Sequence, residues 1–262
     1  MAFDRRTFIK GAGSAALAAG ALSGIAFAEE ATAPTAPVAP SWLGAEPEVA
    51  EADITDTKET TLLIVGAGTA GLACAATALD MGLDFFLAEK LPVISESREY
   101  MGAVNTQLIK DAGIEADTGM LLNELSRYAS GKCDRDLIKM WIDESAEAVE
   151  WYTPMFNAVG EAVMLPDYGG EEQGGTLYYS PVTEHMSGTA YIPPTRNEVI
   201  CNHITDNGGV VNFDYEMVKL VHEDGKVTGA VFNTDDGYVQ VNAKYTVLAC
   251  GGYAANPEMM QA

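Results

Sequence analysis

Three glycines are the residues whose type and spacing point most directly to chemistry. Gly66, Gly68 and Gly71 follow an apolar, β-branched run at residues 60–65 and precede a segment of small residues at 72–81. Where a buried strand turns straight into a helix, the first glycine makes the tight turn and the second lets the backbone approach a pyrophosphate. The third lets helix and strand pack closely. The pattern predicts a phosphate-binding turn between a strand and a helix.

An acidic residue follows these glycines at a suitable distance. The second apolar run, residues 84–88, ends in Glu89, where a carboxylate at the tip of the second strand can accept the hydroxyl groups of an adenosine ribose. The glycine pattern alone is weak evidence, but strand, glycines, helix, strand and acid all stand in order here. We therefore predict a dinucleotide-binding unit in which Thr69 and Ala70 lie beside the phosphates.

Composition sets the size and the partners of the fold. The chain has 262 residues, is 48% hydrophobic and has a mean hydropathy of +0.03, so it can bury a sizeable core as one large domain or two small ones. Its formal net charge is -23, with the acids spread along the sequence and no basic patch. Nucleic acids and anionic membrane surfaces are therefore excluded as partners on electrostatic grounds.

The first 28 residues have the features of an export signal. Arg5 and Arg6 precede a short stretch rich in Ala and Gly at 11–27, and small residues at 26 and 28 offer a cleavage site. We predict export by the twin-arginine route to the periplasm or another extracytoplasmic compartment, without stable membrane insertion after the signal is removed. A membrane-spanning helix is the alternative, but the apolar part is short and rich in glycine.

The residues after the signal change in composition. Residues 29–59 are rich in Ala, Pro, Thr and Glu, which predicts an extended linker that cannot pack. Trp42 and Leu43 are exceptions that we expect to dock on the domain surface. The globular domain is then predicted to span residues 60–262.

The cysteines do not form a recognisable metal or redox motif. None of the four cysteines is part of a CxxC or CxxCH sequence, so the pattern supports no zinc ribbon, no dithiol pair and no attached haem. Cys74, in the first helix, and Cys250, at a strand end, are expected to be small buried core residues. No metal site is predicted.

Two further stretches resemble one flavoprotein family. The first runs from the Glu89–Lys90 pair through Pro92 to Gly-Ala-Val-Asn at 102–105, and the second is Val-Leu-Ala-Cys-Gly-Gly-Tyr at 247–253. Together with the glycine turn, they resemble the flavoprotein subunit of the fumarate reductase and succinate dehydrogenase family, in its soluble exported branch. The resemblance covers roughly residues 41–262 and about the first half of a typical relative.

The resemblance implies an α/β fold and FAD as cofactor. The expected fold is a Rossmann-like FAD-binding domain of the glutathione-reductase type, with a parallel sheet and an antiparallel β-meander, that stops before the capping domain. The residues expected to contact FAD are Gly66, Gly68, Thr69, Ala70, Gly71, Glu89, Lys90, Ser97, Gly102, Ala103, Asn105, Met217, Val218, Ala249, Gly251 and Gly252.

Two departures from the family pattern, and the absence of the histidine that membrane-bound relatives use, shape this expectation. The chain has Ile-Ser-Glu-Ser at 94–97 where relatives have two glycines, so the Ser97 hydroxyl is expected to serve the phosphate in place of a close backbone approach. Ala103 replaces the second glycine of the family motif. No histidine stands in this segment, so FAD is expected to be bound non-covalently.

The rest of the chain is expected to form regular elements around a long irregular loop. The loop is predicted at 163–193 and carries His185, whose role as an acid or ligand is a minority interpretation beside that of an ordinary loop histidine. Proline 154 is expected to end the second of two helices. The predicted elements are helices at 115–129, 135–152 and 195–204, a short strand at 210–213, meander strands at 217–222, 227–233 and 238–242, and a buried strand at 244–249.

The functional hypotheses remain open at this point. The first is the FAD-binding half of an exported flavin-dependent oxidoreductase that reduces an activated C=C bond, as in fumarate or another unsaturated carboxylate. It requires a separate electron donor, such as a cytochrome or a quinol-linked protein, and a second polypeptide or further chain that supplies the capping domain. No residue of this chain, including Arg98 and Arg196, is assigned as the catalytic acid.

Two alternatives compete with this hypothesis. One is a non-catalytic FAD-binding remnant or half of a split enzyme, and the other is an NAD-linked dehydrogenase. The NAD-linked alternative shares the glycine pattern but does not explain the stretches at 102–105 and 248–253.

Overall fold

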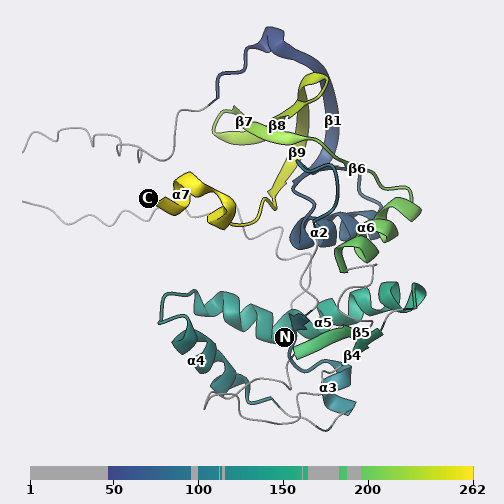
Figure 1. Cartoon of the computed structure of the whole chain (residues 1–262), viewed down its shortest axis with the longest axis vertical. Coiled ribbons are helices and arrows are strands. Elements are labelled where there is room, and N and C mark those ends of the chain that lie inside the picture. Colours follow the sequence, from purple (N-terminus) through teal and green to yellow (C-terminus); the bar gives the residue numbers. More distant parts are fainter. Residues whose placement is uncertain are drawn as a thin grey trace, which may run out of the picture. The chain divides into compact units, whose positions relative to one another are not determined.

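A six-stranded mixed sheet forms the framework of the protein (Figure 1). The computed structural model describes residues 47–95, 100–111, 113, 116–160, 162–164, 183–187 and 196–261. The strand order is β6-β2-β1-β9-β8-β7. The strands from β6 to β9 are parallel to one another, and β9, β8 and β7 are paired antiparallel, so β9 belongs to both parts of the sheet. The strands are β1 (Ile54–Val65), β2 (Phe85–Ala88), β6 (Val211–Asn212), β7 (Glu216–Glu223), β8 (Lys226–Thr234) and β9 (Gly237–Leu248).

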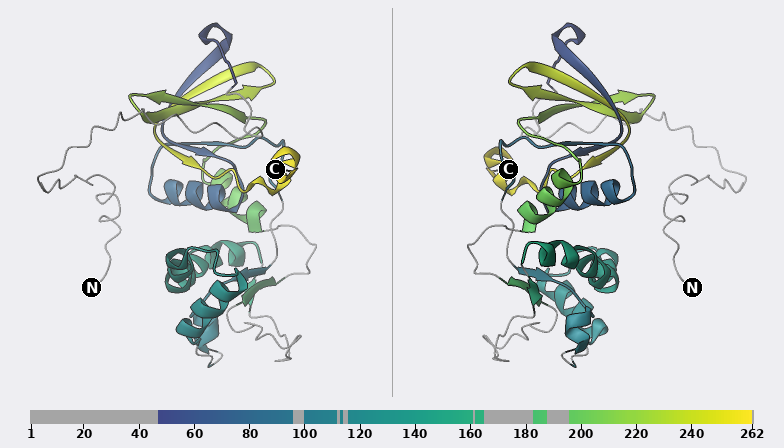
Figure 2. Two further views of the ribbon diagram at one scale, coloured as in Figure 1. Left: turned by 90° about the vertical axis from the view of Figure 1, so that its left-hand side faces the viewer. Right: turned by 90° about the vertical axis from the view of Figure 1, so that its right-hand side faces the viewer.

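Two helices cover one face of the parallel strands. Helices α2 (Thr69–Asp80) and α6 (Arg196–Asp206) pack against each other and lie side by side in both views of Figure 2. Ile64 and Leu87 point to this face and pack with Leu72 of α2 and Ile204 of α6. Because burial alternates along a strand, the neighbours of Ile64 must find their contacts on the opposite face.

The antiparallel strands supply the contacts on the opposite face. Leu63 and Val65 of β1 pack with Phe232 of β8 and Val241 of β9. The sheet twists, so that β7 and β8 run across the direction of β1 in Figure 1. The last three residues of β1, 63–65, are therefore buried with contacts on both faces, which explains the continuous apolar run before Gly66.

The remaining elements form a small sheet and a helical layer. The second sheet is antiparallel with the order β3-β5-β4. Asp117 and Asp134 cap the helices α4 and α5, because each side chain accepts a hydrogen bond from a backbone N–H of the first turn. The elements are η1 (Glu51–Asp53), β3 (Tyr100–Gly102), α3 (Gln107–Asp111), α4 (Thr118–Tyr128), α5 (Arg135–Ala158), β4 (Ala162–Met164), β5 (Thr183–Ser187), η3 (Tyr253–Ala255) and α7 (Pro257–Gln261).

Two strands are longer than the sequence predicts. β1 begins at Ile54, so the last six residues of the predicted linker, 54–59, belong to the sheet and pair with β9. Most of these residues are polar, so a hydrophobicity pattern does not predict a strand here. Backbone pairing with β9, rather than burial of side chains, holds this part of β1 in the sheet. β9 is one continuous strand, although the sequence predicts separate strands at 238–242 and 244–249.

Helix α5 continues past the proline that was expected to end it. It extends from Arg135 to Ala158 with Pro154 inside it. Tyr152 and Phe156 flank the proline, are both buried and stack edge to face, with ring centroids 5.4 Å apart. Their burial offsets the hydrogen bond that a proline removes from a helix interior.

Some predictions concern residues that the structure does not describe. The export signal at 1–28, Trp42, Leu43 and Ser97 all lie outside the described residues. Residues 183–187, predicted to be irregular, form β5, in which His185 pairs in register with Tyr100 of β3 and Met164 of β4. No helix in the described part of the chain is long and apolar enough to cross a membrane.

The cysteines only partly follow the prediction. All four are free thiols. Cys201 is buried and Cys74 is half-buried against the core, but Cys250 is exposed. The prediction that Cys250 is a core residue is therefore wrong, because the strand end on which it lies has one open side. Burial raises the pKa of the Cys74 and Cys201 thiols.

Candidate functional site

The two glycine turns lie next to each other at the carboxyl ends of neighbouring strands. β1 and β9 are parallel and in register to their last residues, where Val65 faces Leu248. The backbone N–H of Ala249 then donates a hydrogen bond to the carbonyl oxygen of Val65 at 2.8 Å. Both strands end at this point, and the backbone leaves the sheet. The turns at 66–71 and 249–252, which are far apart in the sequence, thus share one edge of the sheet, where ligands of α/β folds bind.

Gly66 and Gly71 allow these turns to interlock. Gly66 has a φ of +99°, and a Cβ built on it would lie 2.6 Å from the carbonyl oxygen of Ala249. A Cβ on Gly71 would lie 1.8 Å from the carbonyl oxygen of Gly66 and 3.4 Å from the Cβ of Ala249. Neither position has room for a side chain, so both glycines are required by close backbone packing.

The N-terminus of α2 has the features of an anion site. Gly68 is its N-cap residue, with no side-chain cap and no acidic residue in the first turn. The position of a Cβ on Gly68 has no atom within 4 Å, and Thr69 and Ala70 are exposed. The first N–H groups of a helix lack intrahelical acceptors and carry a partial positive charge. Open space in front of them fits the pyrophosphate of the expected FAD.

Glu89 holds the first glycine turn in place through two backbone hydrogen bonds. Its side chain is buried, with 7% exposed. One carboxylate oxygen accepts a hydrogen bond from the backbone N–H of Ala67 at 2.7 Å and the other from that of Leu91 at 3.0 Å. A carboxylate has about four lone-pair sites, so each oxygen keeps capacity for a ribose hydroxyl. In this structure Glu89 holds the first glycine turn against the end of β2.

The start of β7 is fastened beside Glu89. The backbone N–H of Tyr215 donates to the carbonyl oxygen of Glu89 at 2.9 Å. This contact places Met217 and Val218 close behind the acid in the chain. Met217 packs on the core, and the β7–β8 register shifts between Met217 and Lys219. Val218 lies at this irregularity, where the ladder leaves backbone groups open to another partner.

The segment at 102–105 is fixed by contacts with helices. Ala103 is fully buried and packs with α5 and with Val199 of α6. The N–H of Val104 donates to the Ser145 hydroxyl at 2.9 Å, and Asn105 has a φ of +59°. The methyl group of Ala103 thus fills a helix-packing position, which gives a physical reason for an alanine in place of the family glycine.

Three further predicted contact residues, Lys90, Gly251 and Gly252, are open to solvent. Lys90 is exposed directly after Glu89. Gly251 has a φ of +75°, and neither Gly251 nor Gly252 has an atom within 4 Å of its Cβ position. The second turn therefore presents bare backbone beside the first.

Two residues at the start of α6 were not expected at this site. Asn197 has 2% of its surface exposed; it accepts a hydrogen bond from the Thr69 hydroxyl at 3.1 Å and donates one to the carbonyl oxygen of Ser95 at 2.9 Å. Arg196 donates to the Thr69 hydroxyl at 3.3 Å. Burial lowers the pKa of its guanidinium, and an electrostatic interaction with Tyr152 acts in the opposite direction. The parallel packing of α2 and α6 brings Arg196 and Asn197 beside Thr69, and no local sequence motif predicts this position.

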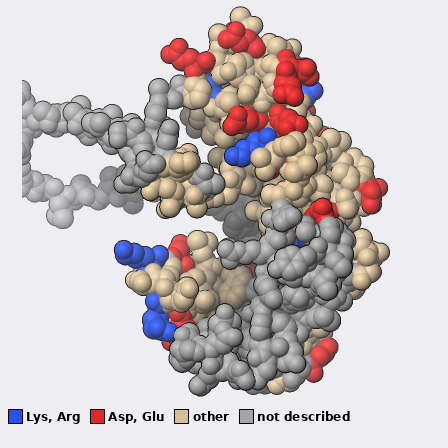
Figure 3. All heavy atoms as spheres, in the orientation of Figure 1, with Lys and Arg blue, Asp and Glu red and all other residues tan. Residues whose placement is uncertain are grey.

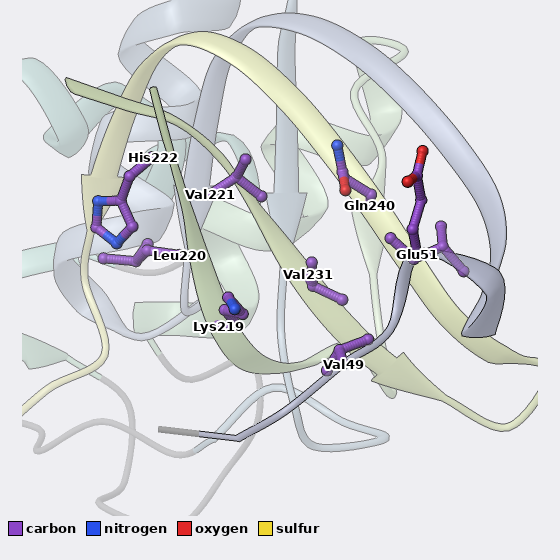
Figure 4. Close-up of a pocket in the computed structure, with 9 residues that line it drawn as sticks. Val49, Glu51, Lys219, Leu220, Val221, His222, Val231 and Gln240 are labelled. Carbon is purple, nitrogen blue, oxygen red and sulfur yellow. The ribbon is translucent and has the colours of Figure 1, made fainter. Parts of the chain in front are cut away.

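A separate hollow lies away from these turns. It has a volume of about 400 Å³ and is drawn in Figure 4, where residues of η1, β7, β8 and β9 surround it. Ile54 and Gln240 line it, and they stand at the opposite end of β1 and β9 from Val65 and Leu248. It includes none of the predicted FAD contacts. In the described residues no group of three or more His, Cys, Asp or Glu side chains is arranged to hold a metal ion.

Comparison with known proteins matches this geometry to one family. The family model for the FAD binding domain matches residues 61–262. A probable fumarate reductase of Shewanella frigidimarina is 28% identical over 207 residues, which cover 77% of this chain and 34% of the relative. The digoxin reductase of Eggerthella lenta is 34% identical over 159 residues, or 56% of this chain and 27% of the relative.

A solved structure shows the same relation. The open conformation of a flavocytochrome c3 fumarate reductase superposes with a TM-score of 0.61 at 25% identity, and the match covers 80% of this chain and 36% of that one. The chain thus spans about a third of the length of these proteins. Its glycine turns, strand order and sequence place it in one group: the chain belongs to the FAD-binding domain family of the fumarate reductase and succinate dehydrogenase flavoproteins.

Proposed function

We propose that this chain is the FAD-binding part of an exported flavin-dependent oxidoreductase that reduces an activated C=C bond, as in fumarate or another unsaturated carboxylate. The observation that carries the proposal is the meeting of the two glycine turns at the ends of β1 and β9, in front of the N-terminus of α2. Relatives named as reductases of fumarate and of digoxin support the reaction class.

Each part of the site has a role in this proposal. The N–H groups of Thr69 and Ala70 bind the pyrophosphate, and the space at Gly68 admits it. Glu89 accepts the ribose hydroxyls while it holds the turn through Ala67. The Ser97 hydroxyl serves the phosphates, and Gly102, Asn105 and the backbone at 249–252 line the flavin side. Bound FAD supplies hydride transfer from flavin N5. No histidine stands at 90–105, so attachment is non-covalent.

The substrate side of the site requires further polypeptide in this proposal. Residues 243–248 of β9 pair with β1 on one side, whereas β8 pairs with β9 only as far as Asn242. Tyr245 and Leu248 at this open edge are 55% and 54% exposed. Tyr245 and Leu248 project from opposite faces of the strand. Further polypeptide that adds a strand here and packs on both faces would cover both, and a capping domain would supply the catalytic acid. Electrons would come from a separate cytochrome or quinol-linked donor.

Cofactor binding is the first test. The purified chain is expected to bind FAD and to show the absorption spectrum of a flavin. Denaturation should release the FAD chemically unchanged, and NAD should show no saturable binding. Saturable NAD binding without FAD binding would instead favour the NAD-linked dehydrogenase.

Catalysis is tested separately with a reduced dye. If the chain with bound FAD is inactive alone, it is either half of an enzyme that requires further polypeptide or a non-catalytic remnant. Oxidation of the dye by fumarate with this chain alone would show that a catalytic acid does lie within it, against the assignment made here.

Export is tested with the first residues of the chain. Residues 1–59 fused to a folded reporter protein are expected to carry it across the membrane, and the double variant Arg5→Lys, Arg6→Lys is expected to leave it in the cytoplasm. Lys10→Arg is the matched control and should not change export. Equal export of the double variant and the unchanged fusion would exclude the twin-arginine route.

A further inference from the structure

Arg196 is a half-buried cation with a nitrogen that lacks a partner. One terminal nitrogen donates to the Thr69 hydroxyl at 3.3 Å. The Nε atom is buried and has no hydrogen-bond partner among the described residues. Within that part of the chain no ion pair joins Arg196 to a carboxylate, although the sequence has 38 acidic and only 15 basic residues. A buried N–H of a charged group left unpaired is unfavourable, so an acceptor is expected nearby.

The surroundings hold Arg196 at the phosphate end of α2. The neighbouring Asn197 is almost fully buried and bridges the Thr69 hydroxyl to the carbonyl oxygen of Ser95. This bridge ties the first turn of α6 to the first residue of α2. Arg196 therefore stands beside the open N-terminus of α2 as a consequence of the packing of two helices.

A positive charge at Arg196 would favour the binding of an anion to this chain. The net charge of the chain is -23, which raises the free energy of bringing in the two negative charges of a pyrophosphate. The end of a helix supplies only about half an elementary charge. A guanidinium adds a full charge and a fork of N–H donors that fits phosphate oxygens.

On the basis of the FAD function proposed above, we propose that Arg196 is a pyrophosphate-binding residue whose guanidinium donates hydrogen bonds to phosphate oxygens of FAD at the N-terminus of α2. The Thr69 hydroxyl then acts as the link that orients the guanidinium in the absence of the nucleotide. None of the sequence motifs marks Arg196 for this role.

A purely structural role is the competing explanation, and the chain offers a matched control for it. Arg135 is also the first residue of a helix, and its guanidinium donates to Ser126 at 2.8 Å and to Asn123 at 2.9 Å. It makes the same kind of contact with a neighbouring helix, far from the glycine turns in the sequence. If Arg196 merely tied two helices together, Arg196→Met and Arg135→Met would behave alike.

The test compares ligands with and without phosphates on the full chain, freed of bound flavin. Dissociation constants for FAD, ADP and adenosine are measured by titration calorimetry with the unchanged chain, Arg196→Met, Arg196→Lys and Arg135→Met. Arg196→Met is expected to weaken FAD and ADP binding about 10- to 100-fold and to change adenosine binding less than about twofold. Arg196→Lys keeps the charge without the fork and should lie between. Arg135→Met should leave all three ligands unaffected.

The outcomes separate this inference from the proposed function. Unchanged ADP binding by Arg196→Met and Arg196→Lys, or an equal loss of ADP and adenosine binding, overturns the role of Arg196. FAD binding that is equally tight in all four proteins overturns it too and leaves the FAD function standing. ADP binding that depends on Arg196 without any FAD binding would support the phosphate site and contradict the FAD function. If the unchanged chain binds neither nucleotide, both fail.

Discussion

At Gly71 a single methyl group decides whether the first turn can form. A Cβ there would lie 1.8 Å from the carbonyl oxygen of Gly66, and neither backbone can move without breaking the register of β1 and β9. Gly71→Ala is expected to lower the free energy of unfolding by about 3 kcal/mol or more, measured by urea denaturation.

The control for this prediction lies in another helix. Gly119 also stands in the first turn of a helix, and a Cβ there would meet only the Asp117 carboxylate at 3.4 Å. Gly119→Ala should therefore change stability by no more than about 1 kcal/mol. Equal effects of the two variants would show that the close contact at Gly71 is not what destabilises the protein.

Gly68 is expected to behave in the opposite way. Its φ of -74° and ψ of -174° suit any residue, and its Cβ position is empty to 4 Å. Gly68→Ala should leave the unfolding free energy within about 0.5 kcal/mol, because nothing in the protein is displaced. The added methyl group would occupy the space proposed for the pyrophosphate, so the dissociation constant of FAD is expected to rise about tenfold or more. Fluorescence titration that shows unchanged affinity would place the phosphates elsewhere.

At the scale of elements, helix α5 contains a proline that lowers its stability and that a substitution can remove. Pro154 lies inside the helix, where a proline removes one backbone hydrogen bond and crowds the preceding turn. Pro154→Ala is expected to raise the free energy of unfolding by about 1–3 kcal/mol, measured by chemical denaturation.

A proline at a helix start provides the comparison. Pro257 is the first residue of α7, a position where no intrahelical hydrogen bond is lost, so Pro257→Ala should change stability by less than about 0.5 kcal/mol. A loss of stability in Pro154→Ala would mean that the packing of Tyr152 and Phe156 depends on the proline.

The elements that the sequence predicts best are those with a local signal. The order of strand, glycines, helix and strand from 60 to 88 is confirmed, as are helix α6 and the three meander strands. Local patterns fail where tertiary contacts decide the outcome. The polar start of β1 is held by pairing with β9, and Pro154 is tolerated in a turn of α5 whose aromatic residues, Tyr152 and Phe156, are buried.

The same distinction applies to the site. The two glycine turns could be found because each has its own motif, and their proximity follows from parallel pairing of β1 and β9. Arg196 and Asn197 could not, because their place beside Thr69 depends on how α6 packs on α2. Whether the predicted residues contact FAD remains a prediction, which Gly68→Ala tests.

At the scale of the whole molecule, charge governs the approach of the cofactor. Acidic side chains predominate over the end of the sheet that carries β7 and β8, on the face drawn in Figure 3, and the net charge is -23. FAD is an anion, so the long-range field opposes its approach at low salt. The association rate constant for FAD is expected to rise between about 20 and 200 mM salt, because screening shortens the range of the repulsion. Stopped-flow fluorescence measures this rate.

Riboflavin is the uncharged reference for this measurement. Its association rate should not depend on salt, since it has no phosphate for the field to act on. A rate for FAD that falls with salt would mean that the local field of Arg196 and the α2 terminus outweighs the distant acids.

Residues 243–248 of β9 pair with β1 on one side, but on the other side they have no strand partner in the described part of the chain. This open edge has a practical consequence for anyone who handles the chain by itself. An open strand edge with exposed apolar side chains is a template on which a second copy can add and begin to precipitate. The surplus of negative charge keeps such copies apart in dilute buffer. Salt that hastens cofactor uptake will therefore also bring the solubility limit nearer.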